Sequence, residues 1–314
     1  YITFRYAQNL ADGNGLVFNV GERFYGSTAM GFAVLLGSLT ALIHKIQAAL
    51  NLTPLMPLPH VAVLISALSL WLIWFVWYRI LVHRRFSLAR WAGGLAVALY
   101  YFNVSYSKIT PGHETYTYFA FLLLAAYLFF DLEAYLSAGV ILALSVMIRP
   151  DALLFAGLVF AIAVIDHFIL QRRKFSELGP KLSSLAVFGV LAAAWEIFLK
   201  AYFGSWIPET MLAKKAQVIL DIFTPFSAGS LVTSIRERGF PGFFLALSAA
   251  VILFIGLLLF NQFRDLDKAS SKKTLVLLTA LWLLHGVGLA AAYISFGVSH
   301  WAWYETPIYY SLVG

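Results

Sequence analysis

Two short polar clusters interrupt apolar stretches of the sequence and carry residues that could do chemistry. His113 and Glu114 lie in the segment PGHET, directly before an apolar run, and Arg149 and Asp151 flank a proline in the segment RPD. A carboxylate at membrane depth is costly and usually marks a polar cavity. There it could act as a general base, a metal ligand or an acceptor of hydroxyl groups. An arginine in such a cluster could hold an anionic phosphate.

Both clusters also have a purely structural interpretation. Glu114 at a helix start would interact favourably with the helix dipole. Asp151 would cap the helix that follows the proline, with Arg149 as an adjacent ion-pair partner. His113 is most simply an ordinary interfacial histidine. The sequence leaves both interpretations open.

Two further clusters have the same double character. The segment PETMLAKK, which contains Glu209 and Lys214, predicts either a surface helix or a helix laid over a cavity, with Lys214 offered to a phosphate. The segment HWAWYE contains His300, Trp303 and Tyr304. It fits an aromatic belt at a membrane interface, and its rings could instead line a saccharide site.

The composition shows which kind of protein must position these clusters. The chain has 314 residues, of which 61% are hydrophobic and 12% charged, with a mean hydropathy of +0.82. A soluble domain would carry about twice that charge fraction. Long apolar runs without polar alternation predict an all-α, polytopic membrane bundle and exclude a membrane β-barrel. The absence of cysteine excludes disulfides and thiolate chemistry.

The apolar runs predict these membrane spans: His60–Val82, Trp91–Tyr106, Tyr116–Phe130, Ser137–Ile148, Ala152–Leu170, Leu182–Phe203, Phe243–Phe263 and Thr274–Phe296. Three basic connections, at 83–90, 171–181 and 264–273, are separated by even numbers of spans and therefore share one side. With Arg79 they hold twelve Lys and Arg against three Asp and Glu, whereas the opposite face holds eight of each. Basic connections face the cytoplasm, so all four polar clusters are predicted to be extracytoplasmic. This bias also explains the net charge of +7, and no nucleic-acid partner is expected.

The segment 29–50 is the exception to the span pattern. Its uninterrupted apolar part ends at Ile43, before His44 and Lys45, which is short of the about 20 residues that a span needs. We therefore predict a helix lying at the outer interface. Residues 1–50 would then form a first extracytoplasmic loop with a juxtamembrane helix.

The clusters and their order resemble those of GT-C membrane glycosyltransferases, most closely the bacterial arabinofuranosyltransferase/mannosyltransferase-like branch. Residues 1–28, with the elements GLVFN (15–19) and GE (21–22), resemble the first extracytoplasmic loop of that branch. GHET, RPD and GSWIPETMLAK resemble its Gly-x-Glu-Thr turn, its Arg-Pro-Asp turn and its Gly…Pro-x-Thr…Ala-Lys segment. HWAWYETP resembles an aromatic segment before a late helix. The match runs through most of the chain, and the ordered set is more specific than any single motif.

The resemblance implies a single transmembrane glycosyltransferase domain over residues 1–314, in a bacterial cytoplasmic (inner) membrane. It implies transfer of a sugar from a polyprenyl-phosphate donor to a hydroxyl of a glycan, glycolipid or protein on the extracytoplasmic side. Glu114 would be a catalytic carboxylate. The implied substrate-binding residues are Arg5, Tyr6, Glu22, His113, Arg149, Asp151, Glu209, Lys214, His300, Trp303 and Tyr304. No cofactor is required, and a divalent cation stays an open alternative.

Two departures from the family pattern matter. Tyr25 stands where the family has a glutamate, and the aspartate expected as principal base would fall just before Tyr1. We therefore expect the chain to be a fragment that lacks the first transmembrane helix and a C-terminal part. Two other classes stay open: a transporter or flippase of a lipid-linked sugar, and a non-catalytic membrane scaffold. A transporter should show two similar halves with broken helices, and the sequence shows no internal repeat.

Overall fold

The structure is a computed structural model in which every regular element of the described residues is a helix. It describes residues 2–52, 57–83, 112–172, 174–220, 225–227, 229–230, 270–297 and 308. The helices are α1 (Ile2–Ala11), α2 (Met30–Ala49), α3 (Leu58–His83), α5 (Thr115–Phe130), α6 (Tyr135–Ile148), α7 (Ala152–Ile165), α8 (Gly179–Phe203), α9 (Glu209–Ile219) and α12 (Ser270–Phe296). A π-helical turn (Asp166–Leu170) continues α7, and a 3-10 turn (Phe175–Leu178) leads into α8. The predicted all-α architecture is confirmed for this part of the chain.

The helix α5 lies at the centre of the bundle. Most of its side chains are buried, and it packs against α3, α6, α7 and α12. α6 also packs closely against α8, where the backbone of Ser184 approaches Gly139 so tightly that a Cβ there would lie 2.5 Å from a carbonyl oxygen. The core is thus built from helices that are apolar on all sides, as expected for a bundle surrounded by lipid.

Five helical segments of the described chain are long and apolar enough to cross a membrane: Met30–Ala49, Leu58–Ile80, Ala152–Ile169, Phe175–Phe203 and Val276–Phe296. α5 and α6 are shorter, at 16 and 14 residues. Four of the five long segments coincide with predicted spans. The predicted spans Trp91–Tyr106 and Phe243–Phe263 lie outside the described residues.

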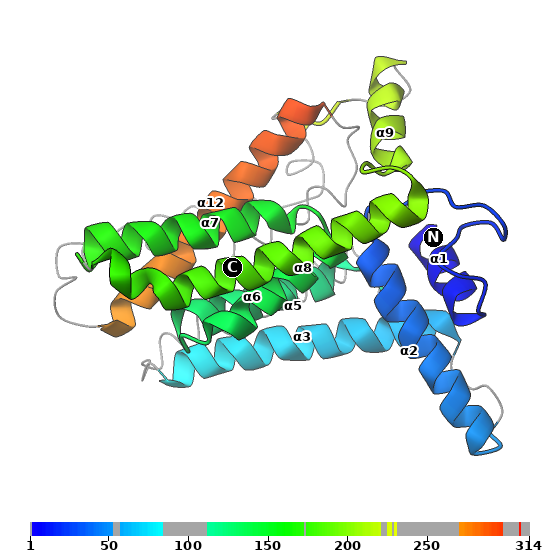
Figure 1. Cartoon of the computed structure of the whole chain (residues 1–314), viewed down its shortest axis with the longest axis horizontal. Coiled ribbons are helices and arrows are strands. Elements are labelled where there is room, and N and C mark those ends of the chain that lie inside the picture. The colour runs from blue at the N-terminus through cyan, green and yellow to red at the C-terminus, as the bar shows by residue number, and fades with distance from the viewer. Residues whose placement is uncertain are drawn as a thin grey trace, which may run out of the picture.

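α2 differs from its prediction in length. The helix continues through His44 and Lys45 to Ala49 and reaches 20 residues, so the argument that the segment is too short to span is wrong. Lysine is a good helix former, and a charge pattern alone does not end a helix. Figure 1 shows α2 crossing obliquely near one end of the bundle, beside α1 and the start of α3. Its location at an interface stays a prediction.

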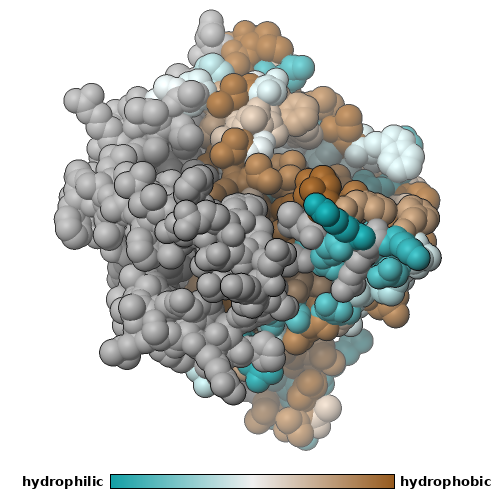
Figure 2. Space-filling view, turned by 90° about the vertical axis from the view of Figure 1, so that its left-hand side faces the viewer, coloured by the Kyte–Doolittle hydropathy of each residue, from teal (hydrophilic) through white to brown (hydrophobic). Residues whose placement is uncertain are grey.

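The two ends of the bundle carry different elements. In Figure 1, α3, α7 and α8 run in roughly the same direction, with α1 and α9 together at one end and the turn from α7 into α8 at the other. Figure 2 looks onto the α7–α8 end, where hydrophilic patches interrupt a largely hydrophobic described surface. Arg172, Lys174 and Glu177 are exposed in this connection, which was predicted to be cytoplasmic.

Candidate functional site

The turn between α6 and α7 holds a buried ion pair. Arg149 is 7% exposed, and its Nε and Nη2 both donate to Oδ2 of Asp151, at 3.0 and 2.5 Å. Asp151 occupies the N-cap of α7 but makes no capping hydrogen bond with its side chain. The expected adjacent ion pair is therefore present, whereas the expected cap is not. The carboxylate is used to hold the arginine.

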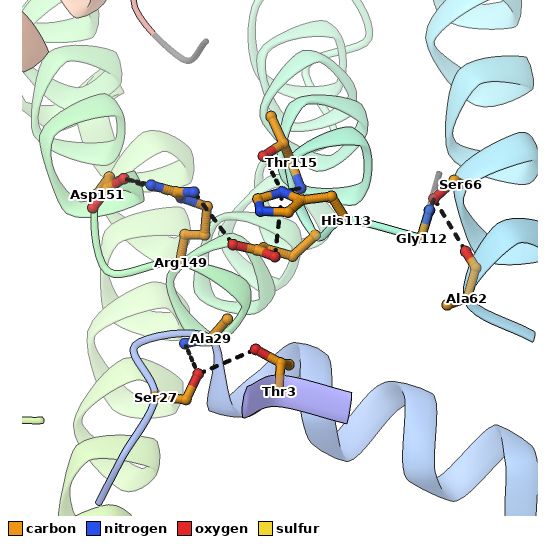
Figure 3. A network of polar contacts seen from close by, with 11 residues as sticks. Thr3, Ser27, Ala29, Ala62, Ser66, Gly112, His113, Thr115, Arg149 and Asp151 are labelled. Atoms are coloured by element: carbon orange, nitrogen blue, oxygen red, sulfur yellow. Dashed lines mark hydrogen bonds and ion pairs between the residues drawn. The ribbon is translucent and has the colours of Figure 1, made fainter. Parts of the chain in front are cut away.

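The second turn brings Glu114 to the same arginine. Nη1 of Arg149 lies 3.4 Å from Oε1 of Glu114. Glu114 occupies the N-cap of α5 without a capping hydrogen bond, so its side chain faces the arginine rather than the helix backbone. Gly112 makes this turn possible, because its φ of +98° lies in the left-handed region and a Cβ would lie 3.0 Å from the Cβ of Ala62. Figure 3 shows His113, Arg149 and Asp151 converging from the two turns.

His113 is neutral in this environment. Burial lowers the pKa of its imidazole; Glu114 offsets part of the effect and Arg149 adds to it. Its Nδ1 lies 2.7 Å from the Thr115 hydroxyl and accepts the backbone N–H of Thr115 at 3.4 Å. The 3.3 Å contact between His113 Nδ1 and Glu114 is therefore not an ion pair. His113 thus orders the turn through Thr115, and its role toward a substrate stays a prediction.

The helix α12 completes the cluster from 142 residues away along the chain. The Tyr293 hydroxyl donates to Oδ2 of Asp151 at 2.7 Å. Two turns earlier on α12, fully buried His285 places Nε2 3.2 Å from the hydroxyl of fully buried Tyr118 on α5. The ring of Tyr118 lies 5.6 Å below the guanidinium of Arg149, at cation–π distance. Arg149 is thus surrounded by carboxylates and aromatic rings.

Charge balance explains why the ion pair tolerates burial. Burial alone would raise the pKa of Asp151, but Arg149 and the Tyr293 hydroxyl outweigh it and hold that pKa below its usual value. Burial also disfavours the charged guanidinium, but Asp151, then Tyr293 and Glu114, raise the pKa of Arg149 above its usual value. Both groups therefore stay ionised at neutral pH. Buried charges persist in proteins when they are paired in this way.

Lys214 on α9 is the second cation of the cluster. Its side chain is half-buried, and its pKa is lowered to about 8 by burial first and Arg149 second, while Asp151 and Glu114 oppose the change. The same charged groups, Arg149, Asp151 and Glu114, thus act on the pKa of Lys214. The base of α9 is fixed by a 2.8 Å hydrogen bond from the Glu209 backbone N–H to the carbonyl of Tyr25.

α5 and α6 are shorter than the five membrane-length helical segments. Sixteen helical residues rise about 24 Å, which is less than the about 30 Å of a bilayer core. In Figure 1, α8 continues past the ends of α5 and α6 toward α9. The cluster therefore lies at the end of the apolar bundle from which α8 leads to α9.

The candidate residues of the first loop have local structural contacts. Buried Tyr6 donates to the carbonyl of Phe24 and accepts the N–H of Gly26 at 2.9 Å. Arg5 donates from Nε to the carbonyl of Phe18 at 3.2 Å, and exposed Glu22 accepts from Asn19 Nδ2 at 3.0 Å. The structure uses these side chains to shape the loop and does not bring them to Arg149. Their role toward a substrate stays a prediction.

The loop is nevertheless attached beside the cluster. Thr3 and Ser27 join their hydroxyls at 3.3 Å, and Figure 3 shows this contact next to the two turns. Tyr25, which stands where the resemblance leads one to expect a glutamate, is buried and stacks on Phe203 with ring centroids 5.0 Å apart. It fills apolar space rather than adding a charge.

Sequence reasoning missed Tyr118, His285 and Tyr293, and could not have assigned all of them. His285 carries a detectable signal, because an ionisable residue inside an apolar span marks a functional site by default. The two tyrosines carry none, since tyrosine is common in membrane helices. His300, Trp303 and Tyr304 lie outside the described residues.

A shallow, apolar hollow lies elsewhere, between α3, α5 and α12. It is lined by Ile73, Trp77, Phe119, Leu123 and Trp282. None of the charged residues of the cluster lines it, so its chemistry is limited to apolar contact. We therefore place the candidate site at the two turns. Among the described residues, no group of three or more His, Asp or Glu is arranged to hold a metal ion.

Comparisons with known proteins place no family on this chain. No protein-family model matches the sequence, and no curated protein or solved structure is significantly similar to it.

Proposed function

We propose that the protein is a membrane glycosyltransferase that moves a sugar from a polyprenyl-phosphate donor to an acceptor hydroxyl on the extracytoplasmic side. The observation that carries the proposal is the buried cluster in which Arg149 joins Glu114 and Asp151 at the ends of apolar helices, with Lys214 of α9 electrostatically coupled to all three. These are the residues that the GT-C resemblance implies for the site. A lipid-linked donor suits a polar cluster at the end of an apolar bundle, because its apolar tail can stay in the bilayer while its headgroup reaches the cluster.

In the proposed reaction, a carboxylate takes the proton of the acceptor hydroxyl, and the hydroxyl oxygen then attacks the anomeric carbon of the donor sugar. The bond between that carbon and the phosphate oxygen breaks, and the lipid phosphate leaves with the electron pair. Glu114 is the carboxylate available for the proton among the described cluster residues, since Oδ2 of Asp151 already accepts from Arg149 and Tyr293. The resemblance additionally implies an aspartate preceding Tyr1 as principal base.

The leaving phosphate needs a positive charge, and we assign this role to Lys214. Arg149 donates twice to Asp151 and holds that carboxylate in place. Lys214 comes from a separate helix and is charged at neutral pH, with a pKa of about 8. Electrostatic stabilisation of developing charge is commonly the largest single contribution to catalysis. Arg149 would then position Glu114 and Asp151.

The donor class tests the proposal directly. Purified protein, extended to include the preceding acidic segment that the resemblance implies, is incubated with a polyprenyl-phosphate sugar or with a nucleotide sugar. We expect turnover only with the lipid-linked donor. Turnover only with the nucleotide sugar refutes the proposal, and movement of the intact lipid-linked sugar across a vesicle membrane without transfer indicates a flippase instead.

A further inference from the structure

The helix α9 has its polarity reversed relative to an ordinary surface helix. Thr210, Lys214 and Gln217 recur at spacings of four and three and are among the less exposed side chains, together with Glu209 and Val218. On the opposite face, Leu212 and Ile219 are 52% and 72% exposed, with exposed Ala216 between them. Residues three and four apart share one face of a helix, so polar groups point inward and apolar groups outward.

This reversal indicates what surrounds α9. A helix at the surface of a water-soluble protein buries its apolar stripe and presents polar residues to the solvent. In α9 the pattern is the reverse, since Lys214 and Gln217 are the more protected side chains and Leu212 and Ile219 are exposed. The outer face therefore fits an apolar environment.

The path of the chain places α9 beside the membrane-crossing helices. α8 ends at Gly204, whose φ of +80° stops the helix with a left-handed residue, and a short connection with exposed Trp206 and Ile207 leads to α9. Figure 1 shows α9 standing at a steep angle to α7 and α8 at the end of the bundle.

We propose that the outer face of α9, defined by Leu212, Ala216 and Ile219, contacts the acyl chains of the surrounding bilayer. The lipid-exposed surface of α8 then continues along α9. Lys215, which is exposed near this face, carries a long stem that lets its ammonium reach the polar headgroups. The helix would then lie between the lipid and the charged turns, with Lys214 on the side facing away from the lipid. This inference depends on the membrane character of the chain and not on the proposed reaction.

The experiment uses the absence of cysteine from these 314 residues, so that a cysteine introduced at one position is the only thiol among them. Leu212→Cys and Ile219→Cys are labelled with bimane in the whole protein reconstituted in vesicles. Asn14→Cys, in the exposed first loop, is the water-facing control. We expect brominated lipids to remove most of the emission at positions 212 and 219, and iodide on both sides of the membrane to leave it unchanged. The control should show the reverse pattern.

Two results overturn the inference. If iodide quenches positions 212 and 219 as strongly as position 14, and brominated lipids do not, then α9 lies in water. If pyrene attached at position 219 gives excimer emission that disappears when labelled protein is diluted with unlabelled protein, a second copy of the chain covers the face instead of lipid. Lys214→Ala is a further control. If lipid holds the helix, removal of the Lys214 ammonium should leave the quenching by brominated lipids at positions 212 and 219 unchanged.

Discussion

The carboxylate of Glu114 occupies a helix N-cap without capping the helix. If it nevertheless acts only as a helix-start charge, Glu114→Gln should cost about 1 kcal/mol or less and leave turnover nearly normal. If it takes the acceptor proton, turnover should fall by about 100-fold or more. We expect the larger loss, because the side chain faces Arg149 rather than the backbone.

Turnover and a thermal melt are measured on the same preparation of the Glu114→Gln protein. Glu177→Gln, at the opposite end of the bundle, is the matched control and should change neither quantity. Near-normal turnover in a stably folded Glu114→Gln protein would remove Glu114 from the site.

Lys214 should give the reaction an alkaline limit. Its pKa of about 8 lies below the usual 10.5, so the free protein loses this charge as the pH rises through about 8. kcat/KM for the lipid donor should fall over the same range, since kcat/KM reports the free enzyme. Lys214→Arg keeps the charge to above pH 12 and should remove the decline, whereas Lys215→Arg should not. An unchanged alkaline decline in Lys214→Arg would show that another group causes it.

The lowered pKa of Lys214 affects stability in the opposite direction, so the free energy of unfolding should rise with pH where activity falls. Between about pH 8 and 10.5 the unfolded chain keeps the Lys214 proton that the folded protein has lost. Because the unfolded state binds more protons than the folded state in this window, the free energy of unfolding rises with pH there. The pH profiles of activity and of melting temperature should consequently diverge above pH 8.

At the scale of elements, Gly31 fixes the start of α2 against the end of α6. A Cβ at Gly31 would lie 2.2 Å from the carbonyl oxygen of Met147, a backbone atom that cannot rotate away. Gly31→Ala should therefore lower the free energy of unfolding by about 1–3 kcal/mol, the usual cost of overpacking, and the melting temperature should fall with it. Gly157→Ala on α7, where a Cβ meets nothing within 4 Å, should raise it or leave it unchanged.

The location of Met147 gives Gly31→Ala a second readout. Met147 lies two residues before Arg149, so a displaced α2 pushes on the charged turn. Turnover should fall together with stability. Equal melting temperatures for the two alanine variants would show that α2 is not seated on α6 as described.

Element bounds were largely predictable because long apolar runs need helices in lipid. The run Leu182–Phe203 appears as α8, Gly179–Phe203, and the two polar turns meet because each lies at the same end of neighbouring helices. The contacts of Tyr118 and Tyr293 were not predictable, because α5 and α12 are apolar on every side and no sequence pattern says which face turns inward. Packing decides that face, and packing depends on helices far apart in the sequence.

At the scale of the whole molecule, the two charged turns and the first loop are predicted to share the extracytoplasmic side. Asn14→Cys and Ser270→Cys test this, since residue 270 begins α12 next to a basic connection. A membrane-impermeant thiol reagent should label position 14 from outside intact cells, and position 270 only after the cells are opened. Labelling of both from the same side would contradict the topology. The cysteine-free parent protein is the background control.

The bond between Tyr293 and Asp151 also sets an order in time. The two residues are 142 positions apart, and a ribosome adds about 5–20 residues per second, so the hydroxyl arrives about 7–28 seconds after the carboxylate. During that interval Asp151 has been synthesised and its Tyr293 partner has not. The growing chain and the finished protein thus differ in the hydrogen bonds available to one buried, charged turn.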